Sequence, residues 1–459
     1  MVNTVSQWKS LRMDGSEKEK IAYPQTNEIV LWLFCGYVIF WYLQGSYRIP
    51  VLGAMRFEFI YGAVLGVIVL VTGGLSRLSS PLVKYVVLLF LCMLIEIPFS
   101  YNQPLSWSIF VDRVLKFAAM GVFIAAFVTN PRSLIFFLGA FLLACLKMGQ
   151  EGFLGMITGN MVWENQGIMR LHGATPLYEH PNSFSGMALG TLPFIYYLFP
   201  LVPRWAKIVL ALLAAFSANI ILFTGSRTGY VAFFVMVMFV FYKSRNKKKF
   251  FAIALVAGIL GLAVVPQDYV ERFESIFTGQ EKEGRSSETR IQILKDAWEV
   301  FLSHPLGVGV AAFPTVRMAR FGRVQDTHNL YLEIATNLGI QGLIIFAMFI
   351  YSMLKLLNKL RKSALDQIRT LEGALVRIDD GCAHAAVYHK HIFDLKLMHA
   401  TVSAVYLFIV IRLALGLFGM DLYEIYWWFA SGLAVALYNI INHAQKKTVV
   451  LAEEIQHVP

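Results

Sequence analysis

The sequence predicts an all-α polytopic membrane protein with about 12 transmembrane helices. Hydrophobic residues make up 57% of the 459 positions, and charged residues make up only 15%. The mean hydropathy is +0.59, and apolar runs recur along the whole chain. A run of about 20 apolar residues crosses the hydrocarbon core of a bilayer, and a helix satisfies every backbone group within that core.

The apolar runs fall into two groups, one between residues 29 and 266 and the other between residues 337 and 441. We expect the first group to supply helices one to nine and the second group helices ten to twelve. The predicted spans are 29–44, 57–73, 82–99, 108–128, 132–148, 183–200, 205–224, 228–242, 250–266, 337–356, 398–418 and 423–441.

Lys and Arg residues place both termini in the cytoplasm, because short cytoplasmic segments of membrane proteins are enriched in them. They collect in the tail 1–28, in the run KSRNKKK at 243–249 and in the loop 357–397. The tail 442–459 then also lies inside. This distribution accounts for most of the net charge of +11, so we expect a topology signal and no nucleic-acid site.

Two loops on the opposite, periplasmic side are long, at about 149–182 and 267–336. The second one contains SSETRIQILKDAWEVFLSHPLGVG, in which Ile291, Leu294 and Trp298 recur at helical spacing. We expect this segment to form a helix on the membrane surface, over the bundle, with this apolar face down.

Ionisable residues within the predicted spans lie near their periplasmic ends. Charges in a bilayer are costly, so they usually face a polar cavity or one another. Asp112 and Lys116 are four residues apart and could pair, whereas Arg113 and Arg412 leave an excess of positive charge. With Arg227 in FTGSRTGY, they predict a cationic pocket open to the periplasm. An amphiphile with a negatively charged head, such as a lipid-linked phosphate, would suit it.

A further group of arginines precedes the tenth span. The segment RMARFGRVQDTHN contains Arg317, Arg320 and Arg323. Such a group either holds lipid headgroups or forms a landing surface for an anionic substrate. The residues alone leave both interpretations open.

Several segments resemble the bacterial O-antigen ligase and polymerase superfamily. GSRTG follows one span, SSETRIQILKDAWEVFLSHPLGVG lies in the large outside loop, and THNLYLEIATNLGIQG enters the next span, in the order expected for that family. RLHGATPLYEHPNSFSGMAL, at 170–189, is similar to its earlier loop-to-helix segment. The combination is more specific than any one segment. The segment 357–397 is longer than the resemblance implies and has no assigned role.

The resemblance implies a glycosyltransferase of the bacterial inner membrane. Such an enzyme transfers a glycan from undecaprenyl pyrophosphate to an acceptor on the periplasmic face, with inversion at the anomeric carbon and without a metal or other cofactor. It also implies that His328, Arg227 and Arg290 are the catalytic residues.

The chemistry of such a transfer favours these residue types. A histidine with a pKa near 6.5 can take the proton of a sugar hydroxyl during attack, and Asp326 could orient its ring. The planar fork of arginine matches the oxygens of a leaving pyrophosphate. Further substrate-binding candidates are Arg113, Lys116, Arg170, Asn182, Arg317, Arg320, Arg323, Asn329 and Arg412.

Three other outside histidines and one pair of polar residues fit helix boundaries. His172, His180 and His304 lie in or near turns, and the last two precede a proline, which disfavours helix at the histidine itself. Asn182 and Ser183 are expected to cap the sixth span, and they could also touch the sugar.

Four functions are compatible with the sequence. A ligase would use a lipid A-core or other glycan acceptor, a polymerase would use a second lipid-linked repeat, and a protein O-oligosaccharyltransferase would use a protein. The preference for the ligase is only slight, because no residue identifies the acceptor. A glycan flippase or transporter of this size usually has two similar halves, which this sequence lacks. Membrane lipids are expected neighbours in every case.

Overall fold

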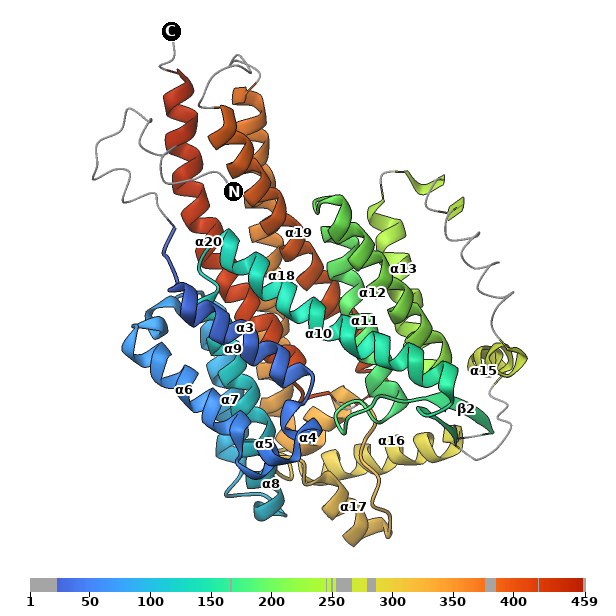
Figure 1. Cartoon of the computed structure of the whole chain (residues 1–459). Coiled ribbons are helices and arrows are strands. Elements are labelled where there is room, and N and C mark those ends of the chain that lie inside the picture. The colour runs from blue at the N-terminus through green and yellow to red at the C-terminus, as the bar shows by residue number, and fades with distance from the viewer. Residues whose placement is uncertain are drawn as a thin grey trace.

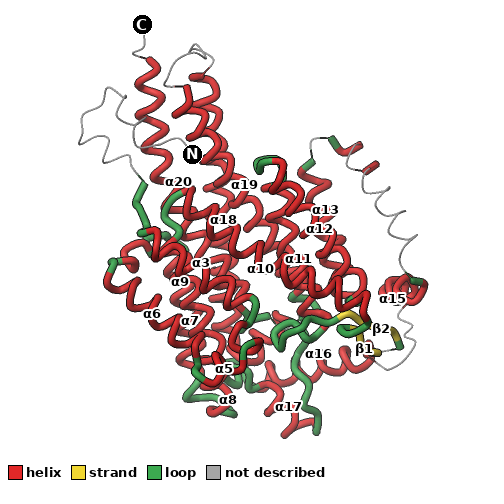
Figure 2. The backbone as a smooth tube through the Cα atoms, in the orientation of Figure 1, coloured by secondary structure: helices red, strands yellow, loops and turns green. Residues whose placement is uncertain are grey.

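The structure, a computed structural model, describes residues 23–165, 167–244, 246–248, 251–252, 266–278, 286–375, 385–419 and 421–456. Helices dominate this part of the chain (Figure 2). Its one described sheet is an antiparallel hairpin of β1 (Val162–Asn165) and β2 (Ile168–Leu171). The predicted all-α class is confirmed apart from this hairpin.

The helices before the hairpin vary in length and include two irregular turns. They are α3 (Glu28–Tyr42), α4 (Gly45–Arg48), α5 (Pro50–Ala54), α6 (Phe57–Val71), the 3-10 helix η1 (Gly74–Arg77), α7 (Val83–Glu96), α8 (Gln103–Ile109), the π-helical turn η2 (Phe110–Leu115), α9 (Lys116–Phe127) and α10 (Pro131–Thr158).

The helices after the hairpin include the longest ones of the described chain. They are α11 (Pro181–Leu198), α12 (Arg204–Phe223), α13 (Arg227–Lys243), α15 (Gln267–Thr278), α16 (Ser286–Ser303), α17 (Phe313–Phe321), α18 (Leu330–Leu375), α19 (Ala385–Leu415) and α20 (Ile425–Gln456). Helices occupy every predicted span except 250–266, which lies almost entirely outside the described residues.

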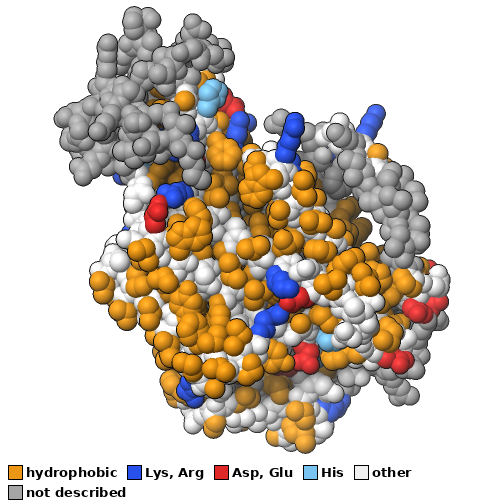
Figure 3. Space-filling view, in the orientation of Figure 1, with side chains coloured by type: hydrophobic (Ala, Val, Ile, Leu, Met, Phe, Trp, Pro, Cys, Tyr) orange, Lys and Arg blue, Asp and Glu red, His pale blue; other side chains and the backbone are white. Residues whose placement is uncertain are grey.

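Among the described helices, α10, α12, α18 and α19 are long and apolar enough to cross a membrane. Helices α3 and α6 are apolar but shorter, with 15 residues each. Apolar side chains cover most of the middle of the face shown in Figure 3. A surface of that kind marks contact with a membrane or a partner. The total of about 12 spans stays a prediction.

The first predicted long loop is shorter than the sequence suggests. Helix α10 continues through 149–158 and ends at Gly159, which has a φ of +76°, a conformation that glycine adopts at little cost. Gly149 and Gly152 resemble loop residues in the sequence. In the structure they allow close helix packing, because a Cβ on either one would come within 3.0 Å of Phe216 or Phe184.

The predicted cytoplasmic loop 357–397 is mostly helical. Helix α18 continues to Leu375 and α19 begins at Ala385, because the apolar side chains of this segment pack against α20. Within this packing, His391 Nε2 lies 3.0 Å from Thr448 Oγ1, which donates a hydrogen bond to Gln367 Oε1 (3.1 Å). The segment is too polar to be a predicted span, but it is apolar on one face.

The hairpin, α16 and α17 lie on the opposite side of the bundle from the extended ends of α18, α19 and α20 (Figure 1). We call the side with the hairpin, α16 and α17 the site face. Several loops that connect helices gather there (Figure 2). The ends of many helices therefore meet at this face.

Helix α16 lies across the bundle on the site face (Figure 1). The apolar face that the sequence predicts to point down is exposed, with Ile291 at 55%, Leu294 at 38% and Trp298 at 53%. The opposite face packs against α17. That small core consists of Ala297, Val300, Val308, Ala312, Phe313 and Val316.

Candidate active site

His328 lies immediately before α18 in an unusual backbone conformation. Its φ is +48°, in a left-handed region that costs a non-glycine residue of order 1–3 kcal/mol. The side chain is exposed, and neither ring nitrogen is hydrogen-bonded to a described residue. The helix cap is Asn329, whose Oδ1 accepts a hydrogen bond from Leu332 N (3.0 Å). His328 is therefore held at the helix entrance without being its cap.

The strained loop is tied to the end of α19. Leu330 N donates a hydrogen bond to Gly416 O (2.7 Å), and Asn329 Nδ2 donates one to Leu417 O (3.0 Å). The sequence predicts Asn329 as a substrate-binding residue. Both polar atoms of its side-chain amide instead bond to the backbone, since Oδ1 accepts from Leu332 N and Nδ2 donates to Leu417 O. Asn329 therefore positions the neighbouring His328.

Charged neighbours set the electrostatic environment of His328. Desolvation by the surrounding protein lowers its pKa below the usual 6.5; Asp326 opposes this effect, and Arg290 and Arg317 add to it. Burial also raises the pKa of Asp326, against a hydrogen bond from Thr327 N to Oδ1 (2.7 Å). His328 is thus neutral at pH 7 and able to accept a proton. Asp326 acts on it through charge and makes no hydrogen bond to the ring.

A second histidine, His180, lies beside these residues. It caps α11, since its Nδ1 accepts a hydrogen bond from Asn182 N (3.1 Å). The prediction that Asn182 and Ser183 cap this helix is wrong, because Pro181 occupies the first helical position, for which its fixed φ is suited. The cap is then the residue before the proline.

Three ionisable groups from other elements act on His180. Partial desolvation by the surrounding protein lowers the pKa of His180, and Arg170, His328 and Arg290 lower it further. Side chains at the starts of α11, α16 and α18 therefore lie within electrostatic range of one another. Arg290 and His328, both predicted to be catalytic, are brought together there from distant parts of the chain.

Arg170 joins three elements of this site. Its side chain is 4% exposed. Nη1 donates a hydrogen bond to Asn165 Oδ1 (3.0 Å), Nη2 donates to Asn182 Oδ1 (3.1 Å), and Nε donates to Thr224 O (2.8 Å). The hairpin, the start of α11 and the end of α12 are linked in this way. Arg170 and Asn182, predicted to bind substrate, instead bind each other and position their neighbours.

Arg227 begins α13 at the turn that Arg170 supports. Gly225 has a φ of +56°, as expected of a tight turn, and Ser226 Oγ caps the helix by accepting a hydrogen bond from Gly229 N (3.1 Å). The Arg227 side chain is half-buried. The predicted turn is confirmed, and its arginine begins the helix that follows Thr224, the residue that Arg170 links to the start of α11.

Residues 210–347 match the family model described as O-antigen ligase. The chain is similar to O-antigen ligases over this segment. The segment contains Arg227, Arg290 and His328, and it confirms the resemblance to the O-antigen ligase and polymerase superfamily. With the apolar helices, it identifies a membrane protein. No curated protein matches the chain.

The matched segment 210–347 does not present Arg317, Arg320 and Arg323 as one open surface. Arg317 is fully buried, with Nε 2.9 Å from Asp296 Oδ2 and a hydrogen bond from Nη1 to Gln325 O (3.0 Å). The prediction is wrong for Arg317, because α17 turns it inward toward α16. Arg320 and Arg323 keep partly exposed side chains, at 43% and 41%.

Arg412 is also not a lining residue of an open pocket. Its side chain is 2% exposed, and Nη2 donates a hydrogen bond to Gly186 O (2.7 Å). Asp421 lies 3.8 Å from Nη1, and the ring of Tyr426 lies 3.2 Å from Cζ. Arg412 therefore joins α19 to α11, in the same region where α19 holds the His328 loop.

Arg113 and Lys116 each have an acidic partner. Arg113 Nη1 lies 2.6 Å from Glu424 Oε1, and Lys116 Nζ lies 3.5 Å from Asp112 Oδ1. The predicted pairing of Asp112 with Lys116 is confirmed. The predicted surplus of positive charge is wrong for Arg113 and Arg412, because Glu424 and Asp421 lie next to them.

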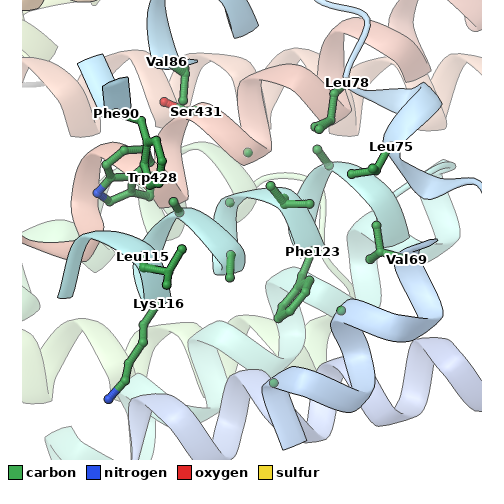
Figure 4. Close-up of a pocket in the computed structure, with 18 of the residues that line it drawn as sticks. Val69, Leu75, Leu78, Val86, Phe90, Leu115, Lys116, Phe123, Trp428 and Ser431 are labelled. Carbon is green, nitrogen blue, oxygen red and sulfur yellow. The ribbon is translucent and has the colours of Figure 1, made fainter. Parts of the chain in front are cut away.

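The structure instead contains an apolar cavity of about 600 Å³ among α6, α7, α9 and α20 (Figure 4). Val69, Phe123 and Trp428 are among its lining residues, and Lys116 lies at one end. Gly66 on α6 also lines it, and a Cβ there would meet no atom within 4 Å. A cavity of this character suits a hydrocarbon chain.

The sequence interpretation missed three acidic residues beneath the site. Glu333 is 3% exposed, and its Oε2 accepts a hydrogen bond from Leu422 N (3.1 Å). Asp421 and Glu424 lie on the same loop before α20. Glu333 is visible as a carboxylate in the motif THNLYLEIATNLGIQG. It precedes the predicted span 337–356, so it was not counted among the ionisable residues of the spans. Within the described residues, no three His, Cys, Asp or Glu side chains form a group that could hold a metal ion.

Proposed function

We propose that this protein is a glycosyltransferase of the bacterial inner membrane, of the O-antigen ligase type. It transfers a glycan from undecaprenyl pyrophosphate to a hydroxyl of an acceptor saccharide such as lipid A-core, and its active site is on the periplasmic side. The observation that carries this proposal is the meeting of His328, Arg290 and His180 on the site face, with two of the three inside the matched segment 210–347.

His328 is the general base of this reaction. Its lowered pKa leaves a ring nitrogen unprotonated at neutral pH, and an exposed base with no internal hydrogen bond is available to an acceptor hydroxyl. The hydroxyl oxygen attacks the anomeric carbon as its proton passes to His328. The bond from that carbon to the pyrophosphate oxygen breaks, and the configuration inverts.

Arg290 and Arg227 stabilise the leaving pyrophosphate. Negative charge grows on the bridging oxygen as the bond breaks, and a permanently charged, planar guanidinium can donate two hydrogen bonds to phosphate oxygens. Both arginines lie on elements that meet at the start of α11. Undecaprenyl pyrophosphate is the leaving group, and loss of the proton from His328 to water restores the base.

The lipid part of the donor occupies the apolar cavity of Figure 4. Lys116, at one end of that cavity, lies one turn beyond Arg113, whose partner Glu424 belongs to the loop held by Glu333 beneath the start of α18. A prenyl chain among α6, α7, α9 and α20 would therefore end near the site. The exposed apolar face of α16 would rest on the membrane surface.

A reconstituted assay tests this function. Purified protein in detergent would be incubated with a lipid-linked glycan and a core saccharide acceptor, and glycosylated acceptor and free undecaprenyl pyrophosphate would be measured. Equal amounts of both products are expected. Joining of two lipid-linked repeats would indicate a polymerase instead, and a lack of transfer to either acceptor would contradict the proposal.

A deletion strain separates the same alternatives in the cell. Loss of a ligase leaves uncapped core and accumulates lipid-linked polymer. Loss of a polymerase leaves core capped by a single repeat. We expect the first phenotype.

A further inference from the structure

His180 carries an arrangement that the proposed base chemistry does not use. Its Nδ1 accepts the hydrogen bond of a backbone N–H, from Asn182 (3.1 Å). In a neutral imidazole, one nitrogen accepts and the other carries the proton. The proton of His180 therefore lies on Nε2, and no described residue accepts a hydrogen bond from it.

The cap also keeps His180 neutral. A protonated ring would carry a hydrogen on Nδ1, which would point at the N–H of Asn182. Arg170, Arg290 and His328 act in the same direction, since each disfavours a positive charge on His180. His180 is thus a fixed donor of one hydrogen bond, and it cannot act as a base or as an acid near neutral pH.

The packing places this donor at the same site as His328. Gly186, two turns into α11, accepts a hydrogen bond from Arg412 (2.7 Å), and Gly416, one turn after Arg412, accepts one from Leu330 (2.7 Å). The starts of α11 and α18 are therefore both held by the end of α19. The His180 side chain is exposed at this point.

We propose that His180 Nε2–H donates a hydrogen bond to a phosphate oxygen of the donor pyrophosphate, as a substrate-binding residue separate from the base. An anionic oxygen is the partner that suits a neutral donor beside arginines, because a hydrogen bond to a charged acceptor is stronger than one to a neutral acceptor. This inference rests on the proposed glycosyl transfer.

The decisive variant is His180→Asn. The Asn Oδ1 can occupy the place of Nδ1, and asparagine is among the best helix caps, so α11 keeps its start while the Nε2–H is lost. Calorimetry of the full-length protein in detergent would measure the binding of inorganic pyrophosphate. We expect roughly 10-fold weaker binding, the scale of one hydrogen bond to a charged group.

His172→Asn is the matched control. His172 lies near the same hairpin, where its ring stacks on Trp163 (4.8 Å between centroids) and Nδ1 lies 2.9 Å from Gly173 O. Pyrophosphate binding should be unchanged in this variant. His180→Gln, which places an amide N–H near the position of Nε2 but loses the cap, should recover part of the affinity.

Kinetics distinguish a binding donor from a titrating group. In His180→Asn the KM for the lipid-linked donor should rise roughly 10-fold, and the pH dependence of kcat/KM should keep its shape. A shifted pH profile, or pyrophosphate binding equal to that of the unmodified protein, would overturn the inference. If the unmodified protein transfers glycan and the variant keeps its KM, only this inference fails; if the unmodified protein transfers none, the proposed function fails.

Discussion

At the scale of single residues, the backbone of His328 is the most informative feature. A φ of +48° in a residue with a Cβ persists only where the surrounding structure enforces it. Here the enforcement comes from the Asn329 cap and from the hydrogen bonds to the end of α19. The loop holds an exposed imidazole in place, as a general base requires.

Replacement of His328 tests this role. His328→Asn should lower glycan transfer about 100-fold or more, the usual contribution of a positioned base, while pyrophosphate binding stays within about two-fold because the arginines remain. Asparagine tolerates the left-handed conformation better than most residues, so the loop should keep its shape. Transfer assays and calorimetry would be compared, and near-normal turnover would exclude His328 as the base.

The charge of Asp326 sets the pH at which His328 works. His328 accepts a proton only when neutral, so kcat/KM should fall as the pH drops through its pKa, which lies below 6.5. Asp326 raises that pKa, so Asp326→Asn should shift the fall in kcat/KM to still lower pH. The kcat/KM of both proteins would be measured from pH 4.5 to pH 8. An unchanged pH dependence would mean that another group titrates.

At the scale of elements, Arg170 holds together the hairpin, α11 and the end of α12. Arg170→Lys keeps the charge but cannot make three separately directed hydrogen bonds. We expect a loss of about 2–4 kcal/mol of stability, as for a broken buried network, together with reduced transfer because the Arg227 turn is released. Thermal unfolding in detergent measures the first effect. The exposed Arg320→Lys serves as control and should change stability by less than about 0.5 kcal/mol.

At the scale of the whole molecule, the orientation of the bundle decides which compartment the site faces. The Lys and Arg distribution predicts that reporter fusions at residues 246 and 370 lie in the cytoplasm and those at 165 and 280 in the periplasm. Activity of a cytoplasm-specific reporter and a periplasm-specific reporter would be compared at each position. A periplasmic signal at residue 370 would contradict the proposed sidedness of the active site.

The apolar cavity predicts a dependence on the length of the donor lipid. Gly66→Leu introduces a side chain that meets no atom at its Cβ but enters the cavity, so it should raise the KM for a long prenyl donor about 10-fold. A donor with a short prenyl chain should be affected less than two-fold, because it does not fill the cavity. Gly139→Leu on α10, where a Cβ also meets no atom, is the control. Equal effects on both donors would contradict the placement of the chain.

The sequence by itself determined the helical membrane class, the positions of most helices and the order of the motif segments. These features depend on local composition and on spacing along the chain, which are visible without a fold. The turn at Arg227, the helix that begins at Ser286 and the polar entrance at His328 belong to this group.

Tertiary structure alone decided which charges are available to a ligand. Arg317, Arg170 and Arg412 look like free cations in the sequence, but each one is buried and bonded to residues far away in the chain, such as Asp296, Thr224 and Gly186. His180 looks like a turn residue and lies beside His328. The cost of burying an unpaired charge forces partners together across the fold, and such pairing leaves no periodic signal along the chain.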